Sequence, residues 1–329
     1  MAEPRRLLLT GANSGIGFEA AVLLCRAGHR LTLLCRDQVT AEDARQQVIS
    51  RAGAGSPPAT VVGDLGDLES VRAAAAELMA TGNPIDTLVL NAGLQYAGSR
   101  EPRRTPQGHE LTFAVNHLGH FLLAQRLLPL LEAGRAPRVV VTASEVHDPA
   151  SAGGRVGPPA GLGDLGGLVD RAGEGVTMVD GSAFSADKAY KDSKLCNVLF
   201  AREWARRLEA RGTPWPVIAW SPGLVIPPTS TGGFWRYSRQ GNELGQRLFA
   251  LAARSLLRLT ESVENAGALL AALASDDAHA AGGFRYLSNR LEGPGRHRFE
   301  ACPTSGEAQD EDLARRLWEA SAALVGVEA

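Results

Sequence analysis

The sequence is poor in aromatic residues, in cysteine and in net charge. Its 329 residues are 5% aromatic, and 34 Lys and Arg against 36 Asp and Glu give a formal net charge of −2. Binding to nucleic-acid phosphates needs a basic excess, so we expect no nucleic-acid partner. The four cysteines (Cys25, Cys35, Cys196 and Cys302) are too irregularly spaced for a disulfide framework or a zinc site. We therefore expect reduced thiols.

Long apolar segments are missing as well. A charged or bulky polar residue interrupts each apolar stretch well before the ~20 residues that a membrane-spanning helix needs. Residues 1–6 lead directly into a strand-like segment, so we expect no signal peptide and a cytoplasmic location. With 44% hydrophobic residues, the composition is that of an ordinary globular protein.

Short apolar segments alternate with helix-like segments along most of the chain. We expect strands at residues 6–10, 31–35, 59–62, 86–90, 138–142, 217–220 and 283–287. We expect helices at residues 18–27, 41–52, 68–79, 111–131, 190–211 and 312–325. Continuous apolar strands that alternate with helices indicate a parallel sheet covered on both faces. The predicted fold is a single α/β domain over residues 1–329, a Rossmann-type doubly wound sheet.

Two long segments interrupt this alternation. Residues 148–183 are rich in Gly, Pro and Asp and precede the helix that begins near Tyr190, and residues 225–260 follow the sixth strand. Long excursions in a compact domain are usually binding loops or lids, although a tolerated surface insertion is the alternative. We expect residues 225–260 to form a substrate lid, with Phe234 and Tyr237 contacting the substrate.

The lid segment also carries arginines between its apolar residues. An apolar face with a cationic border suits a flat apolar ligand that bears a carboxylate, and it also suits peripheral contact with a membrane surface. A helix packed on its own domain, with its arginines in solvent, is the alternative.

A glycine-rich loop, TGANSGIG, joins the first strand to the first helix. In this position glycines permit a tight turn, close approach of the backbone to a phosphate, and close packing of the helix on the strand. The N–H groups at the start of the helix then face the pyrophosphate of a dinucleotide. The residues expected to contact the cofactor here are Gly11, Asn13, Ser14, Gly15, Ile16 and Gly17.

The residue at the end of the second strand indicates which dinucleotide binds. An NAD-selective site has a carboxylate there, for the 2′-hydroxyl of the ribose, but this chain has Arg36. A guanidinium group suits a 2′-phosphate because it is planar and always charged. Asp37 comes one residue too late for the carboxylate role, and we expect it to be solvated. The predicted cofactor is NADPH.

Further candidate cofactor residues follow other predicted strands. Ligands bind at the carboxyl ends of the strands in doubly wound sheets. Asp64 could meet the adenine amino group, and small residues after the fourth strand would let the backbone pass close to the cofactor. The full set at these ends is Asp64, Leu65, Asn91, Ala92, Gly93, Pro222 and Gly223.

The candidate catalytic residues are Tyr190, Lys194, Ser144 and Asn116. Tyr190 and Lys194 are four positions apart in a predicted helix and so share one face. A nearby ammonium group favours the phenolate, so we expect Lys194 to lower the pKa of Tyr190 and permit proton transfer near neutral pH. Ser144 ends the fifth strand and could hold a substrate carbonyl or a developing alkoxide. Asn116 is expected to support Lys194 through a water molecule.

Three histidines were considered as metal ligands. His117 and His120 are three positions apart in a predicted helix, and His147 follows the fifth strand. No further histidine or carboxylate completes a convincing ligand set. We expect packed or cofactor-facing roles for these side chains and no metal site.

With these residues assembled, the chain resembles the short-chain dehydrogenase/reductase family over its whole length. The matching segments are TGANSGIG, NAG, Asn116, Ser144, YKDSK and the Pro222–Gly223 pair. The interval from Ser144 to Tyr190 is much longer than is usual in that family, which places residues 148–183 beside the substrate site as an insertion. Tyr190 and Lys194 are then also expected to contact the cofactor.

The inserted segment extends the resemblance to the light-dependent protochlorophyllide reductases. The segments that carry it are Pro158-Pro159, LGDLGGL at 162–168, MVDG at 178–181, KAYKDSKLCN at 188–197, and ARRLWE at 314–319. The resemblance implies hydride transfer from NADPH to a double bond of the pigment D ring after light absorption. Tyr190 would relay the proton, Lys194 would position the nicotinamide ribose, and Tyr96 and Leu224 would contact the pigment.

Leu224 departs from the pattern of that family. The light-dependent reductases have a cysteine directly after the Pro-Gly pair, and leucine has neither its proton nor its hydrogen bond. Three functions therefore stay open. The first is reduction of a pigment double bond, the second is an NADPH-dependent carbonyl or alcohol reductase acting on a bulky apolar substrate without light, and the third is tetrapyrrole binding without catalysis. The sequence leaves the oligomeric state open.

Overall fold

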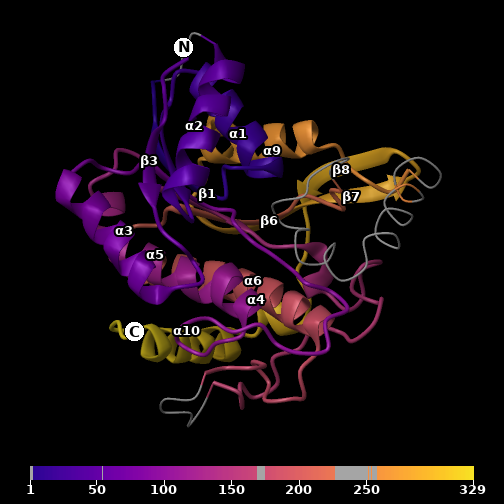
Figure 1. Cartoon of the computed structure of the whole chain (residues 1–329). Helices are drawn as coiled ribbons and strands as arrows, with labels where there is room; N and C mark the ends of the chain where they lie inside the picture. The colour runs from indigo at the N-terminus through magenta and orange to yellow at the C-terminus, as the bar shows by residue number, and fades with distance from the viewer. Residues whose placement is uncertain (1–2, 54, 169–174, 227–250, 252, 254–257) are drawn as a thin grey trace.

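The computed structural model describes residues 3–53, 55–168, 175–226, 251, 253 and 258–329. Eight strands form one sheet in the order β3-β2-β1-β4-β5-β6-β7-β8 (Figure 1). Neighbouring strands run parallel from β3 to β7, and β8 is antiparallel to β7. The strands are β1 (Arg6–Thr10), β2 (Arg30–Cys35), β3 (Ala59–Val62), β4 (Thr87–Leu90), β5 (Arg138–Thr142), β6 (Pro216–Ser221), β7 (Gly283–Gly293) and β8 (Arg296–Ala301).

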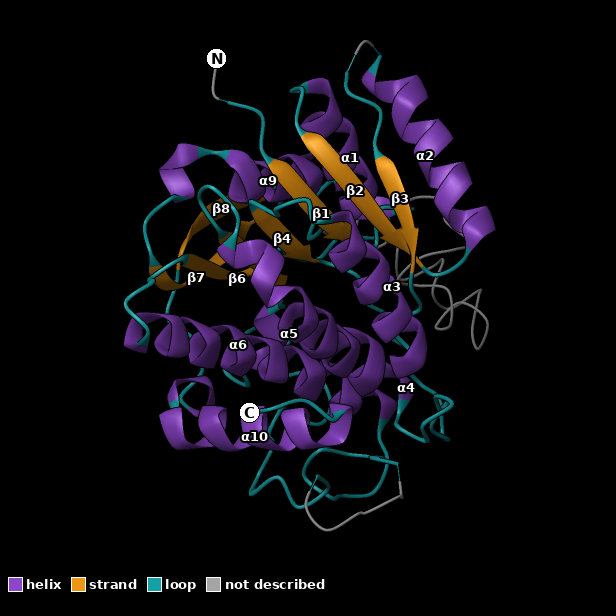
Figure 2. Cartoon of the chain, turned by 90° about the vertical axis from the view of Figure 1, so that its left-hand side faces the viewer, coloured by secondary structure: helices purple, strands orange, loops and turns teal. Residues whose placement is uncertain are grey.

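Helices cover both faces of the sheet (Figure 2). One layer holds α1 (Gly15–Arg26), α2 (Gln38–Ala52) and α9 (Val263–Ser275), and the other holds α3 (Leu68–Thr81), α5 (Gly119–Glu132) and α6 (Ala186–Ala210). The last helix, α10 (Glu311–Val325), packs on the outside of α6 and α5. Along β1, Leu7 and Leu9 belong to the core on the α1 side, whereas Leu8 belongs to the core on the α3 side. The fold is therefore the single-domain, doubly wound α/β fold that the sequence predicts.

The seven predicted strands and six predicted helices are present, with two changes of shape. The helix expected at 111–131 consists of a short α4 (Leu111–Phe113), a π-helical turn at Ala114–Leu118, and α5. β7 continues to Gly293, well beyond the expected residue 287, and turns into β8. π-helical turns are often associated with functional sites, and this one contains Asn116.

Among the described α-helices and strands of more than three residues, α9 and β8 were not predicted. Helix α9 is rich in small residues, and Gly267 lets it approach α1 so closely that a Cβ atom there would lie 2.3 Å from the Cβ of Glu19. Two carbonyl groups near its C-terminus accept hydrogen bonds from Arg138 and Thr87 of the sheet. β8 is an edge strand whose side chains are exposed or half-buried, so it lacks the apolar pattern of the buried strands. Charged residues on an edge strand protect it from pairing with other chains.

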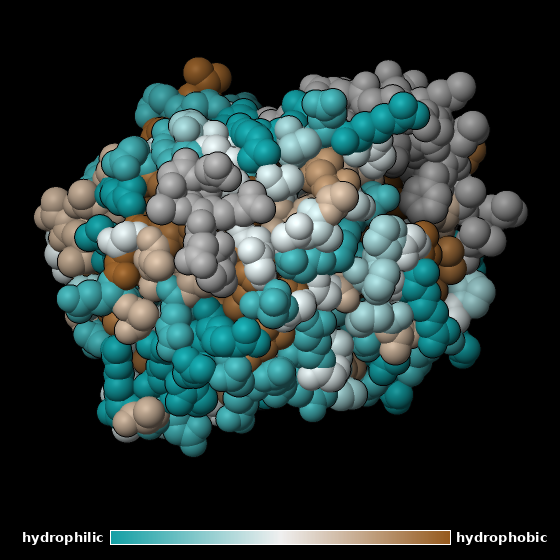
Figure 3. Space-filling view, turned by 90° about the horizontal axis from the view of Figure 1, so that it is seen from below, coloured by the Kyte–Doolittle hydropathy of each residue, from teal (hydrophilic) through white to brown (hydrophobic). Residues whose placement is uncertain are grey.

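Part of the described insertion (residues 148–168 and 175–183) runs below α6 and α10 in Figure 1. Seen from below, the described part of this surface mixes hydrophilic and hydrophobic residues (Figure 3). Among the described residues, no helix is long and apolar enough to cross a membrane.

Candidate cofactor and active site

The glycine-rich loop has the geometry of a phosphate-binding turn. Gly11 has φ +70°, and a Cβ atom on it would lie 2.8 Å from the Cα of Ala92. A Cβ atom on Gly17 would lie 2.3 Å from the carbonyl oxygen of Gly11, so both positions require glycine for close packing. Gly15 has φ +57°, and a Cβ atom there would meet nothing within 4 Å. The loop thus packs tightly at two glycines and borders open space at the third.

The N-terminus of α1 can receive an anion. Ser14 is its N-cap residue, and its side chain makes no capping hydrogen bond. The first turn carries no acidic side chain. Backbone N–H groups in this position attract phosphate because they lack helical partners and lie at the positive end of the helix dipole. These residues fit a dinucleotide pyrophosphate.

Thr10 joins the ends of β1 and β4. Its hydroxyl oxygen accepts hydrogen bonds from the backbone N–H groups of Asn91 and Ala92, each at 2.9 Å, and lies 2.9 Å from Nε2 of His120. The side-chain amide of Asn91 donates to the carbonyl oxygen of Thr10 at 3.1 Å. This positioning role of Thr10 and His120 was not predicted from the sequence. A polar residue at the end of an otherwise apolar strand was the available signal.

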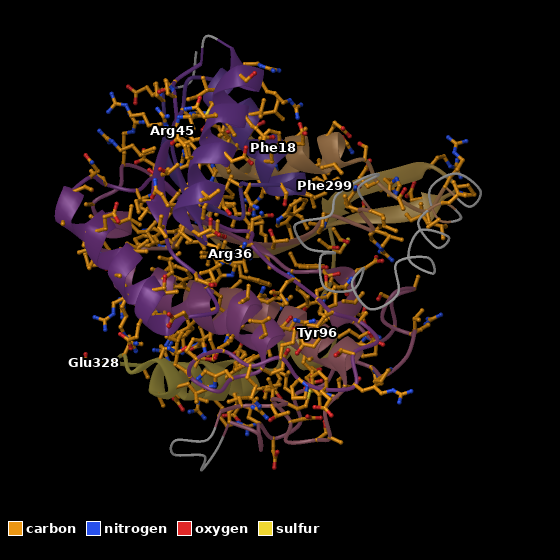
Figure 4. All side chains as sticks on the ribbon, viewed as in Figure 1. Phe18, Arg36, Arg45, Tyr96, Phe299 and Glu328 are labelled. Carbon is orange, nitrogen blue, oxygen red and sulfur yellow. The ribbon has the colours of Figure 1, made fainter. Side chains whose placement is uncertain are left out.

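Arg36 lies at the carboxyl end of β2, as the sequence predicts (Figure 4). Nearly half of its side chain is exposed (47%), and its Nε is 3.2 Å from a carboxylate oxygen of Asp37. Asp37 is also the N-cap residue of α2 and accepts a hydrogen bond from the N–H of Thr40 at 2.8 Å. Asp37 is therefore a capping residue and an ion-pair partner, which adds a local structural role to the solvated carboxylate that we expected.

The residues after β3 and β4 approach the same edge of the sheet. Asp64 accepts a hydrogen bond from the N–H of Gly66 at 2.8 Å, which orders the turn, and Leu65 is buried. A Cβ atom on Gly93 would lie 3.2 Å from Oδ1 of Asn116 and 3.6 Å from Nζ of Lys194. The end of β4 thus passes directly beside two predicted catalytic residues.

Helix α6 brings Tyr190 and Lys194 together. Nζ of Lys194 lies 5.8 Å from the centre of the Tyr190 ring and donates a hydrogen bond to the carbonyl oxygen of Thr142 at 3.0 Å. Burial lowers the pKa of Lys194 to about 7. Burial also raises the pKa of Tyr190, against a smaller lowering by a hydrogen bond with Ser144. The structure thus brings Ser144, Tyr190 and Lys194 to one place.

The expected lowering of the Tyr190 pKa by Lys194 is wrong for this structure. Desolvation of the phenol has the largest effect on its pKa, and the ammonium group is bonded to Thr142 rather than to the phenol. A lowered pKa is expected for a solvated pair, whereas Lys194 is buried and Tyr190 is half-buried in the fold. A buried phenol loses the solvation that stabilises the phenolate.

Asn116 makes direct protein contacts from the π-helical turn. Its Oδ1 accepts from the N–H of Leu94 at 2.9 Å, and its Nδ2 donates to the carbonyl oxygen of Leu94 and to Oγ of Ser193. These bonds join the loop after β4 to α6. Support of Lys194 through a water molecule stays a prediction.

Pro222 and Gly223 follow β6 and are held by β7. The side-chain amide of Asn289 donates to the carbonyl oxygen of Pro222 at 3.2 Å. Gly223 has φ +81°, and a Cβ atom on it would lie 2.8 Å from the carbonyl oxygen of Asn289. The carbonyl oxygen of Leu224 accepts a hydrogen bond from the N–H of Glu261 at 2.9 Å. Neither Asn289 nor Glu261 was predicted from the sequence.

The predicted substrate residues have different environments. Tyr96 is buried (Figure 4), its hydroxyl donates to the carboxylate of Glu110, and it accepts from the N–H of Arg103 at 3.1 Å. Its hydroxyl is thus engaged in internal hydrogen bonds, and contact with a substrate stays a prediction for both Tyr96 and Leu224. Phe234 and Tyr237 lie outside the described residues, as does most of the predicted lid.

The three histidines make hydrogen bonds with other protein groups. Nε2 of His117 lies 2.9 Å from Oγ of Ser321, and Nδ1 of His147 lies 2.7 Å from the carbonyl oxygen of Ser144. Burial lowers the pKa of His117 to about 3 and that of His120 to about 4, so both rings are neutral at pH 7. In the part of the chain that the structure describes, no group of three or more His, Cys, Asp or Glu side chains is arranged to hold a metal ion.

The residues that surround Tyr190 in sequence anchor the insertion. Nζ of Lys191 donates to the carbonyl oxygens of Gly154, Val156 and Pro158 at 2.7–2.9 Å. Nζ of Lys188 lies 2.6 Å from Asp192 and 3.0 Å from Asp180. From the sequence, only the face with Tyr190 and Lys194 was predicted to have a function. The charged residues on the other turns of this helix were the signal that could have predicted these anchoring contacts.

Comparisons with known proteins agree with this geometry. Residues 5–156 match the family model for short chain dehydrogenases. Protochlorophyllide reductase A of Oryza sativa subsp. japonica is 34% identical, over 98% of this chain and 80% of the rice protein. Protochlorophyllide reductase B of Hordeum vulgare is 36% identical, over 97% of this chain and 78% of the barley protein. Both plant proteins are named as chloroplastic.

The fold also matches solved structures. The crystal structure of an uncharacterized protein from Mycobacterium paratuberculosis is similar with a TM-score of 0.69 and 28% identity, over 98% of this chain and 94% of the mycobacterial one. The chain therefore belongs to the short-chain dehydrogenase/reductase family of oxidoreductases. The rice and barley relatives are protochlorophyllide reductases, and the similarity to them extends over nearly the whole chain.

Proposed function

We propose that this protein is an NADPH-dependent reductase of a tetrapyrrole, acting on a ring double bond as the protochlorophyllide reductases are expected to do. The observation that carries the proposal is the joint placement of Ser144, Tyr190 and Lys194 beside the end of β4, which packs on the glycine-rich loop, in a chain homologous to those enzymes over nearly its whole length. The substrate is a small molecule, and the insertion and residues 225–260 would border its site.

The cofactor would lie along the carboxyl ends of β1, β2, β4 and β6. The N-terminus of α1 would receive the pyrophosphate, Arg36 the 2′-phosphate, and Pro222–Gly223 the nicotinamide end. Asp64 and Asn91 would line the path between them. When bound, the reduced nicotinamide supplies a hydride.

The side chains of this protein would handle the proton and orient the substrate. Ser144 would donate a hydrogen bond to an acceptor atom of the substrate, and Tyr190 would give up its proton. Lys194 would position the nicotinamide ribose, and with a pKa of about 7 about half of its amine would be protonated at pH 7. A charged Lys194 would then stabilise the phenolate that Tyr190 leaves behind. Lys194 is buried and Ser144 and Tyr190 are half-buried, so a bound cofactor and substrate would cover what remains exposed of these groups.

A second candidate is reduction of a bulky apolar carbonyl compound without light, and Leu224 favours it. The protochlorophyllide reductases have a cysteine at this place, and an isobutyl side chain cannot donate a proton. The same three catalytic side chains would serve that reaction. A third candidate, tetrapyrrole binding without catalysis, has less support because the catalytic constellation is intact.

An absorbance titration tests these candidates. The protein is mixed with protochlorophyllide, with and without NADPH, and spectra are recorded in the dark and after a flash. A spectral shift in the dark followed by product formation after the flash supports pigment reduction. A dark shift without product points to binding alone. No shift at micromolar protein rejects the tetrapyrrole proposal and leaves the carbonyl reductase.

A further inference from the structure

The two ends of the segment 225–260 meet at one point beside the predicted nicotinamide site. Val225 and Glu261 form an isolated parallel bridge, and the N–H of Glu261 donates to the carbonyl oxygen of Leu224 at 2.9 Å. The chain thus leaves β6 through Pro222, Gly223 and Leu224 and returns against the same residues before α9 begins. The contacts that hold Glu261 in place therefore also hold the backbone of Leu224.

The carboxylate of Glu261 is held by three donors. Only 10% of its side chain is exposed. Its Oε2 accepts from the side-chain amides of Asn289 at 2.9 Å and Asn265 at 2.8 Å, and its Oε1 accepts from the N–H of Ser262 at 2.6 Å. Burial raises the pKa of Glu261, but these hydrogen bonds outweigh it and hold the pKa below its ordinary value. The group is therefore a fixed carboxylate at neutral pH.

Asn289 completes the connection to the sheet. The same side-chain nitrogen that donates to Glu261 also donates to the carbonyl oxygen of Pro222 at 3.2 Å. The backbone oxygen of Asn289 lies so close to Gly223 that a Cβ atom there would be 2.8 Å away. Asn289 is itself buried within β7. One amide group thus joins β7, the Pro222–Gly223 turn and the start of α9.

We propose that Glu261 and Asn289 are positioning residues that fix the segment Pro222–Leu224 against the end of β7. The claim that this segment positions the nicotinamide end of the cofactor rests on the proposed function. Neither side chain is assigned a chemical step. Without the carboxylate, the Asn289 amide loses a charged acceptor and the N–H of Glu261 is held less firmly to Leu224, so the turn samples other conformations. A cofactor that needs one conformation then binds more weakly.

Four variants test the proposal: Glu261→Ala, Glu261→Gln, Asn289→Ala and the control Asn265→Ala. Calorimetry measures NADPH binding, and hydrogen exchange without cofactor measures the segment 221–226 together with the amide of Glu261. We expect Glu261→Ala and Asn289→Ala to weaken NADPH binding about tenfold, the scale of one charge-assisted hydrogen bond, and to speed exchange. Glu261→Gln keeps an acceptor for Asn289 and should stay within about threefold of the unmutated protein. Asn265→Ala removes one donor to the Glu261 carboxylate but leaves the Asn289 contact, so it should change both measurements less than the alanine variants at 261 and 289.

The two measurements separate the two claims. If the unmutated protein fails to bind NADPH, the proposed function is wrong, and the exchange rates still decide the positioning role. If the two alanine variants at 261 and 289 match the unmutated protein in exchange, the positioning role is wrong. Should Glu261→Ala not fold, judged by its circular dichroism, Asn289→Ala and Glu261→Gln decide the question. Equal loss of NADPH binding in the control Asn265→Ala would also overturn the proposal, because it would show only a general loosening.

Discussion

Lys194 points its ammonium group at the carbonyl oxygen of Thr142, 3.0 Å away, while it lies 5.8 Å from the centre of the Tyr190 ring. The two side chains share one face of α6. Burial favours the neutral form of each group, so it lowers the pKa of Lys194 to about 7 and raises the pKa of Tyr190. At pH 7 the phenol of Tyr190 is therefore neutral, whereas the amine of Lys194 is about half protonated. This relationship leads to the first two predictions.

Tyr190→Phe should abolish most turnover while leaving cofactor binding nearly intact. The change removes only the hydroxyl group, so the ring still fills its place on α6. We expect turnover to fall roughly 10²-fold or more, the scale of general acid–base catalysis. Steady-state kinetics and NADPH calorimetry on the same preparations measure the two effects. Unchanged turnover in the phenylalanine variant would rule out this proton donor.

Lys194→Met should make the protein more stable near neutral pH. The folded-state pKa of Lys194, about 7, is below its ordinary value of 10.5. Between these values the unfolded chain binds more protons than the folded one, so the free energy of unfolding rises with pH in this window. Methionine has no charge that burial would desolvate. We therefore expect the variant to be about 2–4 kcal/mol more stable at pH 7, with the difference shrinking toward pH 10.

Urea unfolding of Lys194→Met and of the unmutated protein at pH 7 and pH 9 measures this difference in the free energy of unfolding. Lys188→Met is the matched control on the same helix. Its ammonium group bonds to Asp192 and Asp180, so its removal should destabilise the protein. A Lys194 variant that is less stable at pH 7 would show that the buried amine contributes more through its bond to Thr142 than its burial costs.

Arg36→Ala should erase most of the preference for NADPH over NADH. We expect the unmutated protein to bind NADPH at least about tenfold more tightly, ~1.4 kcal/mol, which suits one charge-assisted contact with a 2′-phosphate. Arg45→Ala is the control, because Arg45 lies on α2 away from Arg36 (Figure 4) and donates to the carbonyl oxygen of Pro58, just before the amino end of β3. Equal affinities for the two cofactors in the unmutated protein would contradict the assignment.

The parts of this structure that could be predicted from the sequence are those with a local cause. Buried strands show as apolar runs, and the tight turn after β1 shows as the glycines Gly11 and Gly15, which both have positive φ. Asn289 and Glu261 could not be found in this way, because they meet Pro222 and Leu224 only after β7 and α9 have taken their places. The prediction of a lowered Tyr190 pKa was wrong for the same reason, because the burial of this side chain depends on the whole fold.

Lys191→Met should detach the insertion from α6. The side chain of Lys191 is buried and donates to three carbonyl oxygens of the segment 154–158. Its loss leaves these acceptors without their charged donor, and we expect the free energy of unfolding to fall by about 2–4 kcal/mol. Denaturant unfolding and limited proteolysis between residues 148 and 160 measure the two consequences. Arg155→Met, an exposed position in the same segment, is the control, and an equal effect there would count against a specific anchor.

Leu224→Cys should restore light-driven reduction if the site takes protochlorophyllide. The backbone of Leu224 is fixed through its carbonyl oxygen by Glu261, so a cysteine should place its thiol where the leucine side chain begins. A thiol supplies a proton and a weak hydrogen bond that leucine lacks. We expect faster photoreduction by the variant, with pigment affinity within a few-fold of the unmutated protein, measured by flash-induced absorbance changes. Leu224→Ala controls for the change in volume and should bind pigment without the gain in rate. Rapid photoreduction by the unmutated protein would show instead that the thiol is dispensable here, because Tyr190 alone then delivers the proton.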